Sequence, residues 1–302
     1  TGHYLLENEL GYAIQRGGAM MPHYRYQHVP GIDMLTEQTH ENLTIKQCTS
    51  VANQCGRQRV LSETYGCTSW EFDFEGQKWV GDWQYALGVN LRSQHLALYS
   101  IRGCRKRDFP PAFSYQNTWW KHNGVVEDYF ARVGRVTTAG QAVRDVLVLH
   151  PVSTGWTLLG ESAASMARTN AYGEALNAFA RALLATHYDW DFGDELIMAD
   201  LARVEGDALI VGEAHYRLVV VPPDVRTLLP ETLSLLEDLL EAGGTVLAVE
   251  PLPTMVAGAP DERLAALWAH ANALVIPGKA GLQAALEARL ERRVSLRTPE
   301  GQ

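Results

Sequence analysis

The chain has 302 residues, 46% of them hydrophobic, which is enough for one large globular domain or two ordinary ones. Its formal net charge of −9 offers no basic surface of the kind that phosphate neutralisation requires, which excludes a nucleic-acid-binding protein. No apolar run approaches the ~20 residues of a membrane span, so we expect no membrane-spanning helix and no membrane partner.

The cysteines lie early in the chain, with no CxxC pair and no histidines at zinc spacing: Cys48, Cys55, Cys67 and Cys104. We therefore expect free thiols, no bound metal and no cofactor. Free thiols favour a reducing compartment, the cytoplasm. The sequence opens without an initiator methionine and already reads as a helix, so we expect a leader or a further segment upstream.

The amino-acid composition changes near residue 140. Tryptophan, tyrosine, histidine and cysteine crowd the first part, whereas alanine, leucine, valine and glutamate dominate the second. This change predicts two domains, covering residues 1–139 and 143–302.

The first part alternates predicted helices and strands. In chain order these are a helix (Tyr4–Arg16), a strand (Ala19–Tyr26), a helix (Thr44–Cys55), a strand (Arg59–Ser62), a helix (Phe74–Leu87) and a strand (Val89–Tyr99). This alternation indicates parallel strands joined by right-handed crossovers. Because a (β/α)8 barrel needs roughly 200 residues or more, three strands can only be the C-terminal portion of one. The chain would then be a fragment of a longer protein.

The second part differs in its predicted strands, which are short and consist almost entirely of apolar residues. Its predicted elements are strands at 145–151, 216–223 and 245–250, helices at Ala171–Thr186 and Pro230–Ala242, and a hairpin in which Ala208–Val211 turns at Gly212 and Glu213. Such strands are typical of a doubly wound, three-layer α/β domain of the flavodoxin or amidotransferase type.

We predict no catalysis in this second domain. It contains no nucleotide-binding glycine motif and no GxSxG. An amidotransferase-like domain needs a nucleophilic cysteine, and no cysteine follows Cys104. A structural role or an oligomer interface is the remaining interpretation.

Glu63 ends the predicted strand at 59–62, in the stretch RVLSETYG. In a parallel barrel the carboxyl ends of the strands line the active site, where a carboxylate is held rigidly and faces a cleft. Hydrolysis of a glycosidic bond commonly uses two carboxylates, one as acid and one as base or nucleophile. Nearby aromatic residues suit stacking against sugar rings, although such residues also fill ordinary cores. We therefore predict that Glu63 is catalytic.

Two segments carry a resemblance to a known family. CTSVANQCGRQRVLSETYG (48–66) and GVNLRSQHLALYS (88–100) resemble the last two barrel strands of glycoside hydrolase family 106, the α-L-rhamnosidases. In that family one motif, ASxAHxYGKxxVxAEAFT, delivers a catalytic glutamate, and a second, GxNRFxxH, delivers an active-site histidine. The matching positions are Ser50, Ala52, Gly56, Val60 and Glu63 in the first motif and Gly88, Asn90 and His95 in the second. Asn53 replaces the histidine of the first motif, and Leu91 the arginine of the second.

The resemblance implies that Glu63 is the base or nucleophile and that His95 and Asn90 contact substrate. The acid glutamate would come from an earlier strand, outside this chain. A barrel followed by an amidotransferase-like domain is also similar to family 42 β-galactosidases, whose second domain makes the trimer contact, which implies a homo-oligomer through residues 143–302. From their predicted places around the strand ends, we expect further sugar contacts from Tyr24 or Tyr26, from Asp33 in the loop after the first predicted strand, and from Trp119. Core burial of Trp119 is an equally open interpretation.

Two hypotheses follow. In the first, the chain is the fragment of a glycosidase that acts on oligo- or polysaccharides and is active only at full length. In the second, it is a non-catalytic carbohydrate-binding or assembly protein that has lost the other carboxylate. A glutamate at a strand end in an upstream segment would favour the enzyme.

Overall fold

The computed structural model describes residues 2–3, 10–106, 111, 113–295 and 298. It divides into two compact units, each considered by itself. Unit 1 holds the described residues within Thr1–Glu7, Tyr24–Asn53 and Arg57–Ala142. Unit 2 holds those within Asn8–His23, Gln54–Gly56 and Val143–Gln302. The two sequence-based domains did not anticipate this exchange of short N-terminal segments.

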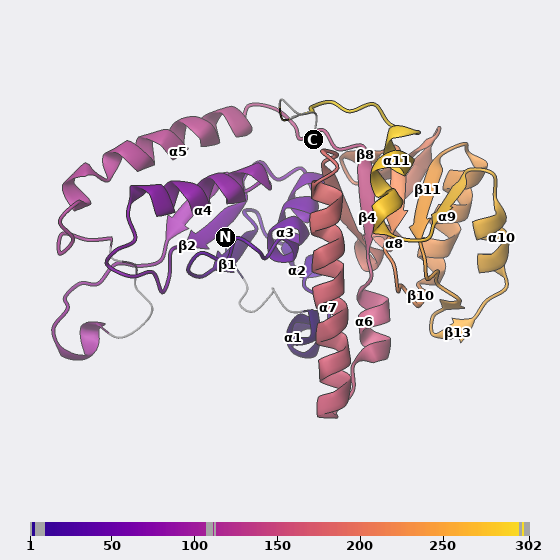
Figure 1. Cartoon of the computed structure of the whole chain (residues 1–302), viewed down its shortest axis with the longest axis horizontal. Coiled ribbons are helices and arrows are strands. Elements are labelled where there is room, and N and C mark those ends of the chain that lie inside the picture. The colour runs from indigo at the N-terminus through magenta and orange to yellow at the C-terminus, as the bar shows by residue number, and fades with distance from the viewer. Residues whose placement is uncertain (1, 4–9, 107–110, 112, 296–297, 299–302) are drawn as a thin grey trace. The chain divides into compact units, whose positions relative to one another are not determined.

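Unit 1 is built on three short strands (Figure 1). Its elements are β1 (Gly31–Met34), α3 (Leu43–Gln54, of which the last residue groups with unit 2), β2 (Leu61–Thr64), α4 (Phe74–Ala86), β3 (Leu91–Gln94), the 3-10 turns η1 (Gly103–Lys106) and η2 (Trp120–His122), and α5 (Gly124–Thr137). The strands pair in the order β1-β2-β3, all parallel. The predicted alternation of parallel strands and helices from residue 44 onward is therefore confirmed.

The strand predicted at Ala19–Tyr26 is wrong. Residues Met21–Tyr24 form the short helix α2, and the first strand of unit 1 is β1. Pro22 is acceptable in the first turn of a helix, where its missing N–H has no partner to lose. Ala19, Met20 and Met21 are buried, so their apolar run reflects burial rather than strand pairing.

The start of α4 shows why its boundary was readable from the sequence. Asp73 has extended backbone dihedrals, and its side chain accepts a hydrogen bond from the Gly76 backbone N–H at 3.0 Å. This is N-capping by an aspartate, which satisfies one of the free N–H groups of the first turn. Glu75 adds negative charge to the same turn, which interacts favourably with the positive end of the helix dipole.

Unit 2 contains a five-stranded parallel sheet in the order β14-β11-β9-β4-β5. The strands are β4 (Val146–His150), β5 (Trp190–Asp194), β9 (Leu218–Val221), β11 (Thr245–Val249) and β14 (Ala273–Ile276). This order, with β4 as the first strand, matches the flavodoxin-like doubly wound arrangement. All residues of β4, β5 and β9 are buried, as expected for apolar strands covered on both faces.

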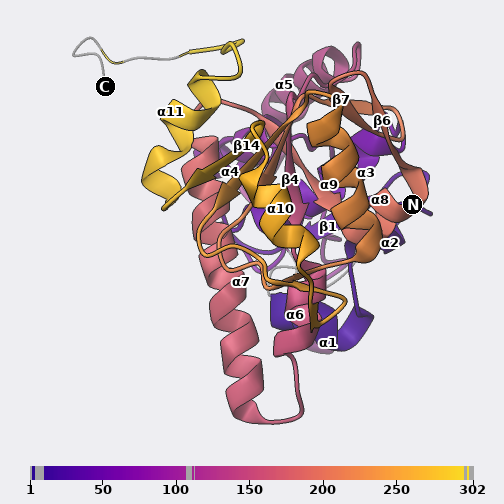
Figure 2. The ribbon, with the colours of Figure 1, turned by 90° about the vertical axis from the view of Figure 1, so that its right-hand side faces the viewer.

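The remaining elements of unit 2 connect and flank this sheet (Figures 1 and 2). They are α1 (Leu10–Gly17), α6 (Val152–Leu158), α7 (Ala163–Leu184), α8 (Glu195–Leu201), β6 (Ala202–Glu205), β7 (Ala208–Val211), β8 (Ala214–Tyr216), β10 (Thr227–Leu228), α9 (Pro230–Glu241), β12 (Met255–Val256), β13 (Ala259–Pro260), α10 (Arg263–Ala269), η3 (Lys279–Gly281) and α11 (Leu282–Glu287). The predicted hairpin is confirmed, because β7 and β8 pair antiparallel around Gly212 and Glu213.

The N-terminal helix α1 packs in unit 2, against α6 and α7 (Figure 2). Residues 4–9 of the predicted helix Tyr4–Arg16 lie outside the described residues. Leu10 and Ile14 join one buried cluster with Val152 of α6 and Tyr172 of α7. The helices approach closely at Gly155, where a Cβ would lie 2.3 Å from the Ile14 Cδ1 atom. A larger side chain at Gly155 would therefore require the Ile14 side chain to move.

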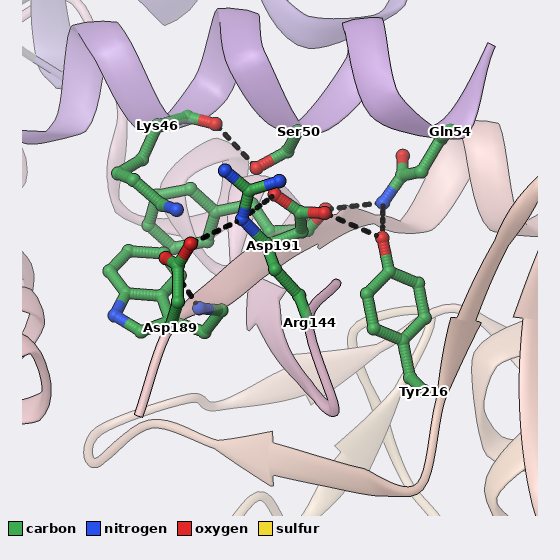
Figure 3. A network of polar contacts seen from close by, with 9 residues as sticks. Lys46, Ser50, Gln54, Arg144, Asp189, Asp191 and Tyr216 are labelled. Carbon is green, nitrogen blue, oxygen red and sulfur yellow. Dashed lines mark hydrogen bonds and ion pairs between the residues drawn. The ribbon is translucent and has the colours of Figure 1, made fainter. Parts of the chain in front are cut away.

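A buried polar network joins the last residue of α3 to the sheet of unit 2 (Figure 3). The Gln54 Nε2 atom donates to the Phe192 carbonyl at 2.8 Å and to the Tyr216 hydroxyl at 3.1 Å. Tyr216 in turn donates to Asp191 Oδ2 at 3.0 Å. Arg144 makes ion pairs with Asp189, at 2.8 Å, and with Asp191, at 3.4 Å. These contacts satisfy polar groups that would otherwise be costly to bury.

Two further expectations concern the whole of the described chain. None of its helices is long and apolar enough to cross a membrane. None of the four cysteines, all of them within the described residues, belongs to a disulfide.

Candidate active site

The register of the unit 1 sheet aligns three polar side chains at one level. Asp33 on β1 pairs with Glu63 on β2, and Glu63 pairs with Ser93 on β3. Each is the third residue of a four-residue strand, close to the carboxyl end. Residues level with one another on neighbouring strands point to the same face, so the two carboxylates come together.

Glu63 lies between two imidazole rings. Its Oε2 atom is 2.5 Å from His3 Nε2, and its Oε1 atom is 3.8 Å from His95 Nε2. The Glu63 side chain keeps 20% of its surface exposed, while that of His95 keeps 12%. A carboxylate that is held by His3, lies beside His95 and is still reached by solvent can meet a substrate.

Asp33 occupies a more enclosed position beside Glu63. Burial raises the pKa of the Asp33 carboxyl, and the neighbouring charge of Glu63 raises it further, against the lowering effect of His3 and His95. Its Oδ2 atom lies 3.9 Å from His3 Nδ1, and its buried Oδ1 atom has no hydrogen-bond partner among the described residues. Asp33 therefore takes up a proton at a higher pH than a free aspartate, which relieves repulsion between the two carboxylates.

His3, Asp33 and Glu63 each offer one ligand atom, and these three atoms lie within 4.8 Å of one another. One imidazole and two carboxylates form a donor set that suits a divalent cation. The sequence-based expectation of no metal rested on cysteine and histidine spacing alone. It did not consider His3, because no local pattern connects position 3 with positions 33 and 63.

Contacts of Arg92 and Tyr65 position the turn after Glu63. Arg92 on β3 donates to the Tyr65 hydroxyl at 2.6 Å, pairs with Glu127 of α5 at 2.9 Å and stacks over the Phe130 ring at 3.8 Å. The Tyr65 hydroxyl donates to the Gln77 carbonyl at 2.8 Å. Burial raises the pKa of Tyr65 to about 12, so this hydroxyl keeps its proton. These contacts hold the strand ends rigid.

The structure brings together only some of the residues that the sequence singled out. Glu63, His95 and Asp33 converge at the strand ends. Asp33, expected in a loop, belongs to β1. Asn90 instead precedes β3, where its side chain accepts from the Val60 N–H and donates to the Gln58 carbonyl. These bonds place Asn90 at the opposite end of the strand from His95.

The predicted aromatic contacts divide in a similar way. Tyr24, the last residue of α2, is completely buried, whereas Tyr26 is 77% exposed and has the Arg25 guanidinium over its ring. Trp119 packs edge-on against Phe74 and Phe113, with centroids 5.4 and 5.3 Å apart. Trp119 therefore borders the aromatic cluster of unit 1. The role of these three residues as sugar contacts stays a prediction.

Comparisons with known proteins show which family and which fold the chain is similar to. The family model of glycoside hydrolase family 106, described as alpha-L-rhamnosidase, matches residues 18–273. A solved rhamnosidase from Novosphingobium sp. PP1Y has a similar fold, with a TM-score of 0.64 and 19% identity, over 89% of this chain and 26% of that one. A solved beta-galactosidase from Bacillus circulans sp. alkalophilus has a TM-score of 0.53 and 14% identity, over 78% of this chain and 34% of that one.

A curated relative, a putative beta-glucuronidase of Formosa agariphila, is 25% identical over 211 residues, which are 68% of this chain and 16% of the relative. The chain therefore spans about a sixth of the length of that relative and about a quarter of the solved rhamnosidase. At these identities, the two solved structures show a shared fold, with mixed α/β architecture and parallel sheets.

Proposed function

This chain belongs to glycoside hydrolase family 106, the family described as alpha-L-rhamnosidases, and from this premise we propose that it supplies the base or nucleophile of a glycosidase, Glu63. The observation that supports this role best is the position of the Glu63 carboxylate. It stands at the carboxyl end of a parallel strand, between His3 and His95, and remains partly exposed.

The second carboxylate of the reaction is a separate group. Asp33 offers an oxygen within 4.8 Å of a Glu63 oxygen, from the neighbouring strand and the same edge of the sheet. Acid and base act from opposite sides of the glycosidic bond, with the sugar between them. Asp33 and Glu63 instead contact the same imidazole, that of His3, from neighbouring strands, so we assign Asp33 to hold that ring and not to act as the acid. We propose that the acid comes from residues outside this chain and that the 302 residues alone are inactive.

In this proposal β1, β2 and β3 are the last three strands of a (β/α)8 barrel. The parallel pairing and the polar residues near the strand ends support it. Unit 2 is then a non-catalytic, amidotransferase-like domain that contributes to a homo-oligomer. The strand order of its sheet and the absence of any cysteine after Cys104 support that role.

The test is Glu63→Gln in the intact protein that carries this chain. The amide keeps the shape but loses the charge that activates water or stabilises the oxocarbenium-like transition state. We expect hydrolysis of an aryl α-L-rhamnoside to fall by ~10²- to 10⁴-fold or more, with sugar binding retained. Glu174→Gln, an exposed position on α7, serves as the control and should leave the rate unchanged.

The same assay separates the alternatives. Aryl β-D-galactosides test the choice of sugar, since the solved neighbours include a beta-galactosidase. If Glu63→Gln retains most of the activity, the catalytic assignment is wrong. If the intact wild-type protein cleaves no glycoside but binds sugar, the non-catalytic carbohydrate-binding hypothesis is favoured.

A further inference from the structure

A groove of about 630 Å³ opens in unit 1, lined by the loops that follow β1 and β2 and by the first turns of α4. Its lining residues are Thr36, Glu37, Cys67, Thr68, Ser69, Glu71, Phe72, Asp73, Glu75, Gly76 and Trp79. Both loops leave the carboxyl ends of their strands. The groove therefore lies on the same edge of the sheet as Asp33 and Glu63.

Direct contacts join the walls of the groove to the candidate active site. The Thr36 N–H donates to the Gly66 carbonyl at 2.8 Å, which ties the two loops together. A Cβ on Gly66 would lie 3.2 Å from the His95 ring and 2.8 Å from Leu35. Gly66 thus packs between the first loop and the histidine beside Glu63. The loop after β2, which walls the groove, therefore also packs against the histidine beside Glu63.

The backbone of these loops is held in an unusual conformation. Thr36, Tyr65 and Cys67 have positive φ values of 52°, 68° and 62°. Non-glycine residues seldom adopt this left-handed region, and a β-branched threonine does so least readily. Such strain is retained where surrounding structure imposes it, often at ligand sites. Two of the three residues line the groove.

The side chains that face the groove suit a sugar ring. Trp79 is 62% exposed and offers an indole face for stacking. Hydroxyl groups come from Thr36, Thr68 and Ser69, and carboxylates that can accept from sugar hydroxyls come from Glu37, Glu71 and Glu75. This is the mixture of one apolar platform with several polar groups that fixes a ligand's orientation.

The charge of the groove selects among sugars. Of its eleven lining residues, all within the described part of the chain, none is basic. A hydrogen bond from Ser69 holds the pKa of Glu71 below its usual value, so this side chain stays anionic. Lys78, the nearby cation on α4, is engaged by Asp82 and the Tyr129 ring. A uronate or sulfated sugar would therefore meet uncompensated negative charge.

We infer that this groove is a subsite for a neutral sugar unit on the leaving-group side of the bond cleaved at Glu63, with Trp79 as its platform. The inference rests on the proposed function. It adds that the sugar unit on the leaving-group side is uncharged. Glu71 and Glu75 weaken the binding of sugars that carry a carboxylate.

Calorimetric titration of the intact protein in a Glu63→Gln background tests the inference without hydrolysis. The probes are L-rhamnose, which fills only the site at Glu63, and α-L-rhamnosyl-(1→4)-D-glucose. Trp79→Ala should weaken disaccharide binding by about tenfold and leave L-rhamnose binding unchanged. Trp79→Phe should restore most of the affinity.

Trp70→Ala is the matched control. Trp70 is exposed on the loop between β2 and α4, near Trp79 in the sequence, but it does not line the groove. This variant should change neither affinity. Equal effects of the two tryptophan variants, or equal wild-type affinities for rhamnose and disaccharide, would overturn the subsite. Hydrolysis that still depends on Glu63 would then leave the proposed function standing.

A separate titration tests whether the groove binds a negatively charged sugar more weakly than a neutral one. α-L-rhamnosyl-(1→4)-D-glucuronate differs from the neutral probe by one carboxylate and should bind more weakly at low salt. Glu71→Gln combined with Glu75→Gln should narrow the difference by roughly fivefold, and raised ionic strength should narrow it as well, because exposed charges are screened. A difference that neither change alters would refute the electrostatic part.

Discussion

Both units carry carboxylates at the carboxyl end of a parallel strand, yet the surroundings differ. In unit 1, the side chains of Asp33 and Glu63 keep 9% and 20% of their surface exposed and face histidines. In unit 2, Asp194 ends β5 and Glu195 begins α8, and both are completely buried. The two pairs of carboxylates occupy similar positions at strand ends, but only the pair in unit 1 is accessible to solvent.

The buried pair, Asp194 and Glu195, makes hydrogen bonds that stabilise the fold of unit 2. Asp194 Oδ1 accepts from the backbone N–H groups of Leu196 and Ile197 at 3.0 and 3.1 Å, which caps α8. Glu195 accepts from the Leu229 N–H at 2.7 Å and from the Ser153 hydroxyl. Burial raises the pKa of both carboxyls, that of Asp194 to about 7. A strand-end carboxylate is therefore a candidate for catalysis only where a substrate can reach it.

Glu195→Ala should have the largest effect. The change leaves the part-buried Leu229 N–H without its acceptor, removes one of the two acceptors of the Ser153 hydroxyl and opens a cavity, so the free energy of unfolding should fall by about 3 kcal/mol. Urea unfolding of the intact protein measures this. Glu174→Ala on the exposed face of α7 is the control and should cost almost nothing. Equal stabilities of the two variants would show that the Glu195 contacts contribute little.

Asp33→Asn should act on the reaction instead. It removes the ionisable neighbour of Glu63 and the carboxylate that faces His3, so kcat/KM of the intact protein on its glycoside should fall by about tenfold to a hundredfold. The melting temperature should stay within the range of Asp128→Asn, the same change at an exposed position on α5. If Asp33→Asn and Asp128→Asn had the same kcat/KM, Asp33 would have no part in the reaction.

The smallest expected effect is a pH dependence confined to unit 2. His150 lies level with Asp194 on β4, and burial lowers its pKa to about 4. Between pH 4 and 6.5 the unfolded chain binds the His150 proton that the folded state has lost, so this residue makes stability rise with pH. Asp194 behaves oppositely between pH 4 and 7, because the folded state keeps a proton that the unfolded chain has released.

The two contributions oppose each other, and single variants should separate them. Relative to wild type, Asp194→Asn should gain stability as pH rises from 4.5 to 6.5, and His150→Phe should lose it, each by up to about 1.4 kcal/mol per pH unit. Urea unfolding at several pH values gives both slopes. The exposed Asp207→Asn variant should follow wild type. Slopes of the same sign would contradict the opposed ionisations.

The structure of the site explains which residues could be found in advance. Glu63 lies one residue before the end of β2 and His95 directly follows β3, each strand coming after a helix, so local pattern was enough to place both. Asp33 was expected in a loop because β1 has only four residues and follows Pro30. The segment Ala19–Tyr26 resembled a strand because its apolar residues Ala19, Met20 and Met21 are buried, although they lie outside the strands and Met21 begins the helix α2. His3 has no local signal at all.

The sequence by itself determined the helix and strand alternation, the parallel pairing in unit 1 and the strand-end position of Glu63. These depend on side-chain periodicity, caps and turns, which act over a few residues. Tertiary structure decided that α1 packs in unit 2, that His3 and Asp33 meet Glu63, and that Asp194 and Glu195 are sealed from solvent. Each of these depends on contacts between residues far apart in the chain, where burial and charge, rather than local pattern, determine what a side chain can do.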